Sequence, residues 1–183
     1  MIRITKASHS EELEQILLLQ QKNLARNISR SEAIEQGYVT VIHTPDQLQK
    51  MQQLAPAILA KDDEKVVGYA LTMPVSCSKL IPVLEPMFAS LESLEYKSRP
   101  LKSFSYYVMG QVCIDKAYRG LGIFDRLYAG HKEIYGSQYD CIVTEVATRN
   151  TRSLKAHQRV GFKSIHQYTD ETDEWEVMVW DWS

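Results

Sequence analysis

Hydrophobic and polar residues follow two spacings along the chain, and these spacings predict its strands and helices. Ile2 and Ile4 alternate with polar residues, which predicts a strand at the start of the chain. Leu13, Ile16 and Leu24 recur at helical spacing, which predicts a helix over residues 9–26. The same two rules predict strands over residues 57–60, 65–73, 104–114, 141–146, 165–168 and 175–182, and helices from residue 44 and over residues 87–94, 121–135 and 150–161.

Residue types at the predicted helix ends support these boundaries. Thr44 with Gln47 three residues later has the capping-box pattern, and so does Ser8 with Glu11. In such a box the two side chains accept hydrogen bonds from main-chain N–H groups that the helix leaves free. The predicted last helix begins and ends at residues that favour these positions, Asn150 and Gly161.

Three segments are less regular. Residues 37–43 are β-branched and aromatic and are compatible with a strand or with part of a loop. Asp62 and Asp63 separate two predicted strands, which indicates a hairpin. Four prolines interrupt residues 74–103 and exclude one long helix there, although residues 87–94 remain helical: Pro74, Pro82, Pro86 and Pro100. We expect an insertion between two strands, and loops of this length are usually functional.

The predicted order is β-α-α-β-β, the insertion, then β-α-β-α-β-β, which is an α+β protein. At 183 residues, 44% of them hydrophobic, the chain is long enough to bury a core without disulfides or a structural metal. We expect a single domain over residues 1–183, with the insertion at about residues 74–103.

Composition excludes several classes of protein. The formal net charge of −2 argues against a partner bound mainly through phosphates, so no nucleic acid is expected. The three cysteines form no CxxC pair, and the histidines lack metal-ligand spacing, so neither a disulfide framework nor a metal is predicted. No segment has the apolar length of a membrane span or a signal peptide. These features predict an intracellular, cytoplasmic protein without a membrane partner.

The segment over residues 111–127 carries the clearest chemical signal. Gly120 and Gly122 lie between a predicted strand and an amphipathic helix, in residues 119–124, which we call the glycine loop. Glycine lets the main chain approach a ligand, and the free N–H groups of a helix start attract a phosphate or diphosphate. Arg119 adds a side-chain charge. Alternatively, the helix start needs glycine only for close packing, and the spacing alone does not decide between the two.

Two blocks of sequence resemble the GCN5-related N-acetyltransferase (GNAT) superfamily. Residues 119–124, Arg-Gly-Leu-Gly-Ile-Phe, resemble its acyl-CoA signature, Arg/Gln-x-x-Gly-x-Gly/Ala. The second block runs from Thr144-Glu145-Val146 through Asn150 and Ser153 to Gly161-Phe162, and it resembles the family's later strand, capped helix and Gly-Phe ending. The resemblance covers residues 104–168 closely. Phe124 departs from the family's small residue, and His157 stands where the family usually has Tyr.

The resemblance implies a fold, a coenzyme and a reaction. The fold would be a mixed, mostly antiparallel sheet with helices on both faces (α/β/α), in which two strands that end near Ile114 and Val146 splay apart for the coenzyme. The reaction would move an acetyl group from acetyl-CoA, as cosubstrate, to a primary amine of a small molecule or peptide by direct attack. The residues implied in coenzyme binding are Val112, Cys113, Ile114, Arg119, Gly120, Leu121, Gly122, Ile123, Phe124, Asn150 and Ser153.

Two residues are candidates for acid–base chemistry. His157 could protonate the leaving sulfur, since an unperturbed imidazole is partly protonated near neutral pH; alternatively it is a partly exposed helix residue without a role. Glu145 is a charged residue in an apolar strand and could deprotonate the acceptor amine. The alternative, which we favour, is that it only bonds to a neighbouring strand or to Arg149. Tyr106 or Tyr107 could line the acceptor pocket, although such aromatic residues are more often core.

Two other functions compete with the transferase. The same fold could bind acyl-CoA as a non-catalytic sensor, or Cys113 could serve as the nucleophile of a thiol hydrolase. Cys113 and Cys141 lie in strands that we expect to be buried, which disfavours the hydrolase. The sequence does not identify the acceptor, and a homodimer is compatible with it.

Overall fold

A computed structural model describes all residues, 1–183. Its contacts divide the chain into two compact units. The first unit comprises Met1–Thr72 and Gly110–Glu133, and the second comprises Met73–Met109 and Ile134–Ser183. The division falls within two strands and within a helix. The expectation of a single domain stays a prediction. None of the helices combines the length and the apolar character that crossing a bilayer requires.

The strands form a seven-stranded, mostly antiparallel sheet in the order β1-β2-β3-β6-β7-β9-β8, so the predicted α+β fold class is confirmed. Their bounds are β1 Ile2–Lys6, β2 Ile58–Asp62, β3 Lys65–Pro74, β6 Tyr106–Ile114, β7 Cys141–Ala147, β8 Lys163–Thr169 and β9 Glu174–Asp181. β6 and β7 pair in parallel, from Tyr106 with Cys141 to Val108 with Val143. β7 and β9 pair antiparallel along their length.

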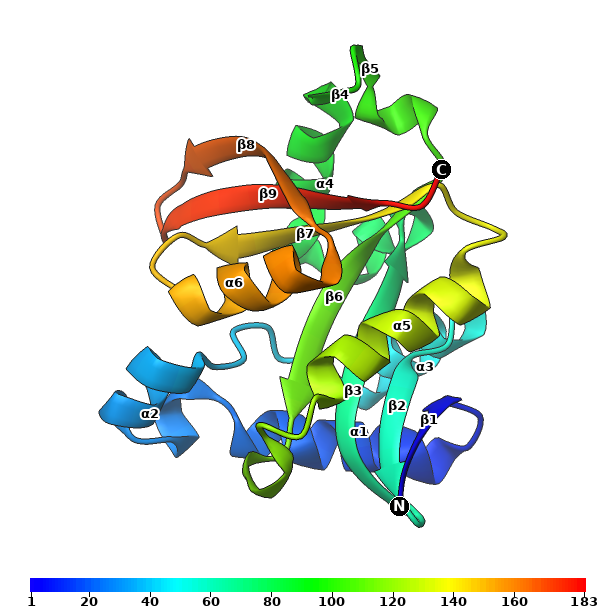
Figure 1. Cartoon of the computed structure of the whole chain (residues 1–183), viewed down its shortest axis with the longest axis vertical. Coiled ribbons are helices and arrows are strands. Elements are labelled where there is room, and N and C mark those ends of the chain that lie inside the picture. The colour runs from blue at the N-terminus through cyan, green and yellow to red at the C-terminus, as the bar shows by residue number, and fades with distance from the viewer. The chain divides into compact units, whose positions relative to one another are not determined.

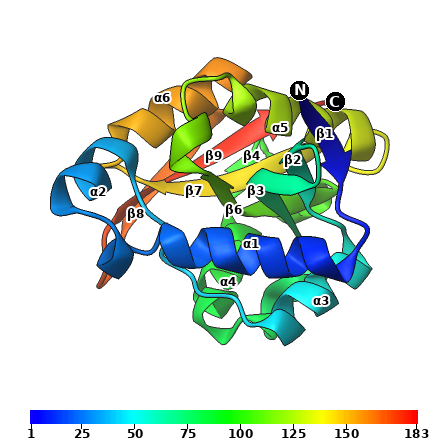
Figure 2. The same ribbon diagram turned by 90° about the horizontal axis from the view of Figure 1, so that it is seen from below.

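In the first unit, helices lie on both sides of β1, β2 and β3 (Figure 2). α1 (Ser10–Lys22) and α3 (Pro45–Leu54) lie on one side, and α5 (Ile123–Tyr135) lies on the other. α5 approaches the strands closely at Gly130, where an added Cβ would lie 2.7 Å from a methyl of Ile4. A glycine therefore allows this helix to pack directly on β1 and β2.

The ends of these helices confirm one predicted cap and correct another. Thr44 and Gln47 form the predicted capping box at the start of α3. The predicted box of Ser8 with Glu11 is wrong, because Glu12 instead accepts hydrogen bonds from the main-chain N–H groups of Ser8 and His9. Helix α1 also ends at Lys22, earlier than predicted, and a 3₁₀ turn, η1 (Ala25–Asn27), follows it.

A short helix between α1 and α3 is missing from the sequence prediction. α2 (Arg30–Gln36) begins after Ser29, whose side chain accepts a hydrogen bond from the main-chain N–H of Glu32. The segment over residues 37–43, left open above, is a loop whose only sheet-like contact is an isolated bridge between Val39 and Leu24. This loop connects α2 to α3.

In the second unit, α6 (Thr151–Val160) covers one side of β7, β9 and β8 (Figure 1). The predicted insertion is only partly irregular, because α4 (Glu85–Ser93) confirms the predicted helical segment. Short elements surround it: η2 (Val75–Leu80), η3 (Pro82–Leu84), β4 (Glu95–Tyr96), β5 (Arg99–Pro100) and η4 (Leu101–Ser103). β4 and β5 form a separate two-stranded hairpin.

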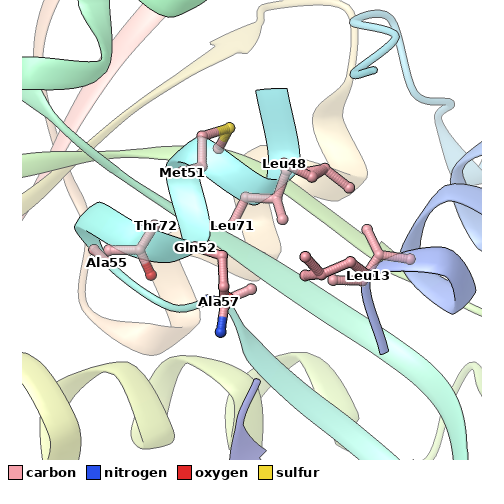
Figure 3. A pocket seen from close by; sticks show the side chains of 9 residues that line it. Leu13, Leu48, Met51, Gln52, Ala55, Ala57, Leu71 and Thr72 are labelled. Carbon is pink, nitrogen blue, oxygen red and sulfur yellow. Dashed lines mark hydrogen bonds between the residues drawn. The ribbon is translucent and has the colours of Figure 1, made fainter. Parts of the chain in front are cut away.

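A small cavity lies within the first unit between α1, α3 and β3 (Figure 3). Its volume is about 10 Å³, which is room for no more than one water molecule. Most of its lining is apolar: Leu13, Ile16, Leu48, Met51, Gln52, Ala55, Ala57, Leu71 and Thr72. It is therefore a packing gap and not a ligand site.

Candidate coenzyme and acyl-transfer site

The glycine loop adopts a main-chain conformation that requires glycine. It follows η5 (Lys116–Tyr118) and leads into α5, and Gly120 and Gly122 have φ angles of +78° and +71°. A Cβ added at either glycine would meet nothing within 4 Å. Close packing therefore does not explain these glycines, whereas the left-handed backbone does.

This conformation leaves a row of main-chain donors free. The N–H groups of Gly120, Leu121, Gly122 and Ile123 have no acceptor in the protein. Leu121 is 59% exposed, so the row is open to solvent. Successive free N–H groups next to the positive end of a helix dipole form an anion site. The loop therefore fits a phosphate or diphosphate.

The side chain of Arg119 is held by protein groups. Its Nη1 lies 2.9 Å from Oε1 of Glu32, and its Nη2 donates to Oδ1 of Asn23 at 2.7 Å. Its Nε donates to the main-chain oxygen of Ile114. The guanidinium thus joins the ends of α1 and β6 to α2 at the start of the glycine loop. The anion site itself is made of main-chain groups.

Glu32 completes this arrangement and was not identified from the sequence. Its Oε2 lies 2.7 Å from Nζ of Lys116, and hydrogen bonds from Lys116 and Arg119 lower the pKa of its carboxyl group. A local signal for α2 was present, because Ser29 and Glu32 have the spacing of a capping box. The contact with Arg119 spans 87 positions, and no local pattern reports such a contact.

The last part of β6 is less buried than its place in the sheet suggests. β6 is the fourth of seven strands, yet Gly110, Gln111, Val112 and Ile114 are only half-buried. Cys113 is buried among them, and burial raises the pKa of its thiol to about 12. A protonated, buried thiol is a poor nucleophile, which argues against the thiol hydrolase. An open segment of main chain in a central strand is where an extended ligand can pair with a sheet.

In the second unit, Asn150 and Ser153 form the start of α6. Oδ1 of Asn150 accepts a hydrogen bond from the main-chain N–H of Ser153 at 3.1 Å, which confirms the predicted N-cap. The helix ends at Gly161, in the left-handed conformation, as the sequence predicted. Any contact of Asn150 with a ligand would therefore use its amide N–H₂.

His157 is buried, with 2% exposure, and its ring packs edge-on against Phe162. Burial lowers its pKa to about 4, although its bond to the main-chain oxygen of Ser153 acts in the opposite direction. The expectation of a partly protonated imidazole is therefore wrong, and so is the alternative of an exposed residue. Since Ser153 O can only accept, Nδ1 carries the proton of the neutral ring.

Glu145 is a half-buried carboxyl group with a raised pKa. Its Oε2 accepts a hydrogen bond from the hydroxyl of Tyr168 at 2.7 Å, and its Oε1 is buried without a partner. Burial raises the pKa of Glu145 to about 6, and the bond from Tyr168 limits that rise. The suggested partner Arg149 instead pairs with Asp173. Glu145 is thus ionised at neutral pH, with one oxygen available to accept a proton.

The remaining candidates in the second unit are mostly core. Tyr107 is fully buried against Tyr135, Tyr139 and Trp182. Tyr106 is also buried, but its hydroxyl has no partner. Burial raises the pKa values of the other two thiols, to about 11 and about 12: Cys77 and Cys141.

The predicted site residues therefore divide between the units. Residues 112–114 and 119–124 lie in the first unit, and Glu145, Asn150, Ser153 and His157 lie in the second. A family model of the acetyltransferase (GNAT) family matches residues 28–162, which is most of the chain. The chain belongs to the GNAT acetyltransferase family. The match includes the glycine loop and every predicted site residue.

Solved structures of other GNAT proteins share this fold. The ribosomal-protein-S18-alanine N-acetyltransferase from Escherichia coli is 12% identical, with a TM-score of 0.65 over 100% of this chain and 95% of its own. An N-acetyltransferase from Staphylococcus aureus Mu50 is 17% identical, with a TM-score of 0.64 over 100% of this chain and 99% of its own.

A third structure, yncA from Salmonella typhimurium, was solved with its cofactor acetyl-CoA. It is 13% identical, with a TM-score of 0.64 over 100% of this chain and 95% of its own. A search of curated protein sequences gave no match. At these identities the structures support the fold and not the choice of acceptor.

Proposed function

We propose that this GNAT protein is an N-acetyltransferase that moves an acetyl group from acetyl-CoA to a primary amine. The observation that carries the proposal is the row of free N–H groups at Gly120, Leu121, Gly122 and Ile123. These donors lie in the loop that resembles the family's acyl-CoA signature, and they suit the diphosphate of coenzyme A.

The coenzyme would be held mainly by main-chain groups. The free N–H groups from Gly120 to Ile123 would bind the diphosphate. The main chain of the segment from Val112 to Ile114 would pair with the pantetheine arm. We keep Asn150 and Ser153 as proposed coenzyme contacts. The coenzyme supplies the activated acetyl group as a thioester.

The reaction needs a neutral amine, because an ammonium has no lone pair for attack. We propose that Glu145, with its raised pKa and its unpartnered Oε1, accepts the proton of the amine. The amine nitrogen then bonds to the acetyl carbon and releases its second proton to solvent, the carbon–sulfur bond breaks, and the thiolate takes a proton from solvent. No covalent enzyme intermediate is required.

His157 has a different role in this proposal from the one its position in the sequence suggested. A neutral imidazole with a pKa near 4 is a weak acid and a poor proton donor to sulfur. Its bonds to Ser153 at the start of α6 are better suited to holding that helix end. We therefore propose it as a positioning residue.

The acceptor class is a small molecule or a peptide. The structurally similar proteins have different acceptors: one is an S18-alanine acetyltransferase, and another is described as a phosphinothricin N-acetyltransferase. The three buried thiols suit a reducing compartment, and we propose the cytoplasm.

Release of free coenzyme A thiol from acetyl-CoA, measured against a diverse panel of amines, tests this function. We expect release that depends on the amine, with the acetylated amine found by mass spectrometry. Binding of acetyl-CoA without transfer to any amine would instead support the sensor. Loss of activity after thiol alkylation of correctly folded protein would support the hydrolase.

A further inference from the structure

Helix α2 has no buried apolar face to hold it against the rest of the first unit. None of its residues is buried, and its isoleucine, Ile34, is exposed. It lies apart from β1, β2 and β3 in both views (Figures 1 and 2). A surface helix usually docks through an apolar stripe. In α2 the side chain of Glu32 is only 13% exposed, because it lies against Lys116 and Arg119. The docked position of α2 therefore depends on this carboxylate.

The two oxygens of Glu32 are divided between two cations. Oε1 lies 2.9 Å from Nη1 of Arg119, and Oε2 lies 2.7 Å from Nζ of Lys116. Lys116 is exposed, and an ion pair with an exposed lysine contributes little in water. The side chain of Arg119 is only 18% exposed, and a charge-assisted hydrogen bond shielded from water is stronger. The contact with Arg119 therefore carries most of the docking.

The other two nitrogens of the Arg119 guanidinium have acceptors outside α2. The side-chain nitrogen of Asn23 donates to the main-chain oxygen of Leu19, which can only accept, so Oδ1 of Asn23 faces Nη2 of Arg119 at 2.7 Å. Nε of Arg119 donates to the main-chain oxygen of Ile114. Three nitrogens thus have three acceptors from three segments. The set is complete only when α2 is docked and Glu32 supplies the third.

Arg119 directly precedes the free donors of Gly120 to Ile123. Side-chain packing at the glycines does not hold the loop, because a Cβ added at Gly120 or Gly122 would meet nothing within 4 Å. The loop is instead held at its two ends, by Arg119 and by the start of α5. Fixing Arg119 therefore reduces the freedom that the row of donors must lose when a ligand binds, which raises affinity.

We propose that Glu32 is a positioning residue that couples the docking of α2 to the binding of coenzyme A. This coupling rests on the proposed coenzyme site and adds a residue that acts on it through Arg119. Coupling between two binding events is reciprocal. Docked α2 therefore raises the affinity for the coenzyme, and bound coenzyme stabilises docked α2, with no contact between the two.

The sign of one effect separates positioning from simple electrostatics. Glu32 places a negative charge at the start of a loop that suits an anion. By charge alone, removal of this carboxylate should strengthen the binding of a diphosphate. If Glu32 instead holds Arg119 in place, the same removal should weaken it. The two roles therefore predict opposite changes.

Calorimetric titration with coenzyme A measures this sign in Glu32→Ala and in a matched control, Glu35→Ala. Glu35 is exposed on the same helix and has no hydrogen bond or ion pair, so its removal changes the charge equally without touching Arg119. We expect Glu32→Ala to lower the affinity about tenfold, the factor typical of one hydrogen bond to a charged group, and Glu35→Ala to keep it. In transfer assays the loss should appear in KM for acetyl-CoA, with kcat unchanged.

A double-mutant cycle shows whether Glu32 acts through Arg119. In an Arg119→Met protein, adding Glu32→Ala should cause no further loss, because the group that Glu32 holds is already absent. An equal loss from Glu32→Ala in both backgrounds, or unchanged or stronger binding by Glu32→Ala alone, would overturn the coupling and leave the transferase intact. Absence of coenzyme A binding by the wild type would overturn the proposed function as well.

Hydrogen exchange of the wild-type protein covers the case in which Glu32→Ala does not fold. The main-chain N–H groups of Ala33 and Gly37 donate to oxygens within and just before α2. Saturating coenzyme A should slow their exchange about tenfold, since reciprocity gives docking the same factor as affinity. A folded Glu32→Ala protein should lose this protection. Unchanged exchange in wild-type protein that binds coenzyme A would contradict the coupling.

Discussion

Glu145 shows how one residue gains a chemical property from its surroundings. The sequence places a carboxyl group in an apolar strand, and burial there raises its pKa to about 6. The donor that limits this rise is Tyr168, on β8, and that partner was not predicted. β9 separates β8 from β7 in the sheet, so the contact depends on the strand order and not on local spacing.

If Glu145 is the base, kcat/KM should fall about tenfold per pH unit below pH 6, because protonation removes the group that accepts the amine proton. Glu145→Gln should lower kcat/KM by about 10²–10³ and remove this acidic limb. The variant Tyr168→Phe tests the same role of Glu145. Loss of its hydrogen bond raises the pKa of Glu145 and should move the limb to higher pH. An identical acidic limb in Glu145→Gln would exclude this role.

Substitutions of Arg119 can separate the effect of its positive charge from the effect of its directed hydrogen bonds. Its guanidinium contacts Asn23, Glu32 and the main chain of Ile114, and a lysine cannot reproduce three such directed bonds. Arg119→Lys should therefore weaken acetyl-CoA binding about as much as Arg119→Met does, by roughly tenfold. Calorimetry measures both, with the exposed Arg26→Met as control. Normal binding by Arg119→Lys would show that charge alone matters.

At the scale of elements, local patterns predicted most helices and strands because each has a regular apolar face or a cap. The box of Thr44 with Gln47, the N-cap at Asn150 and the ending at Gly161 are local features, and all three are confirmed. The errors lie where a local pattern competes with a distant partner. Glu12 forms the cap in place of Glu11 and also pairs with Lys61, 49 positions away.

The site was predictable to the same extent. The glycine loop was found because its conformation depends on Gly120 and Gly122 themselves. The residues that hold it, Glu32 and Asn23, come from distant segments, and they contact Arg119 through hydrogen bonds that only the folded chain forms. The spacing of residues therefore predicts which main-chain groups face the ligand, but it does not predict the side chains that hold this loop in place.

The close approach of α5 to β1 and β2 gives a stability prediction. Alanine usually stabilises a helix relative to glycine by about 1 kcal/mol. At Gly130, however, the added Cβ would lie 2.7 Å from Ile4 and 3.1 Å from Ile58, and such overpacking costs about 1–3 kcal/mol. Gly130→Ala should therefore lower the free energy of unfolding by about 1 kcal/mol in urea titrations.

The exposed neighbour Ala129 provides the control for Gly130. Ala129→Gly should also destabilise, by about 1 kcal/mol, because only helix propensity acts there. A rise in stability for Gly130→Ala would show that the helix and the strands are not in close contact.

At the scale of the whole molecule, three buried histidines predict sensitivity to acid. Burial lowers the pKa values of His43, His131 and His157 to about 4, 3 and 4. Between their unfolded value near 6.5 and these values, the unfolded chain binds protons that the native protein does not. Stability should therefore be complete above about pH 6.5 and fall as the pH decreases, by up to about 4 kcal/mol per pH unit from the three rings.

Protonation of Glu145 has the opposite effect on stability over part of this pH range. Because its pKa is raised in the native protein, Glu145 binds a proton in the native state before the unfolded state does, between about pH 6 and 4.5. Over that range it cancels the contribution of about one histidine to the slope of the unfolding free energy with pH. Urea titrations at several pH values measure the net slope, and His131→Phe should reduce it by about one proton. Equal stability at pH 7 and pH 5 would contradict the burial of these rings.

The central claim is that the free main-chain donors of the glycine loop bind the diphosphate of coenzyme A, and calorimetric titration with coenzyme A tests it most directly. We expect one-to-one binding in the micromolar range for the wild type. We also expect a large loss of affinity for a protein with both Gly120→Ala and Gly122→Ala, whose side chains strain the left-handed backbone. No heat of binding from the wild-type protein, or undiminished affinity in the double variant, would contradict the account.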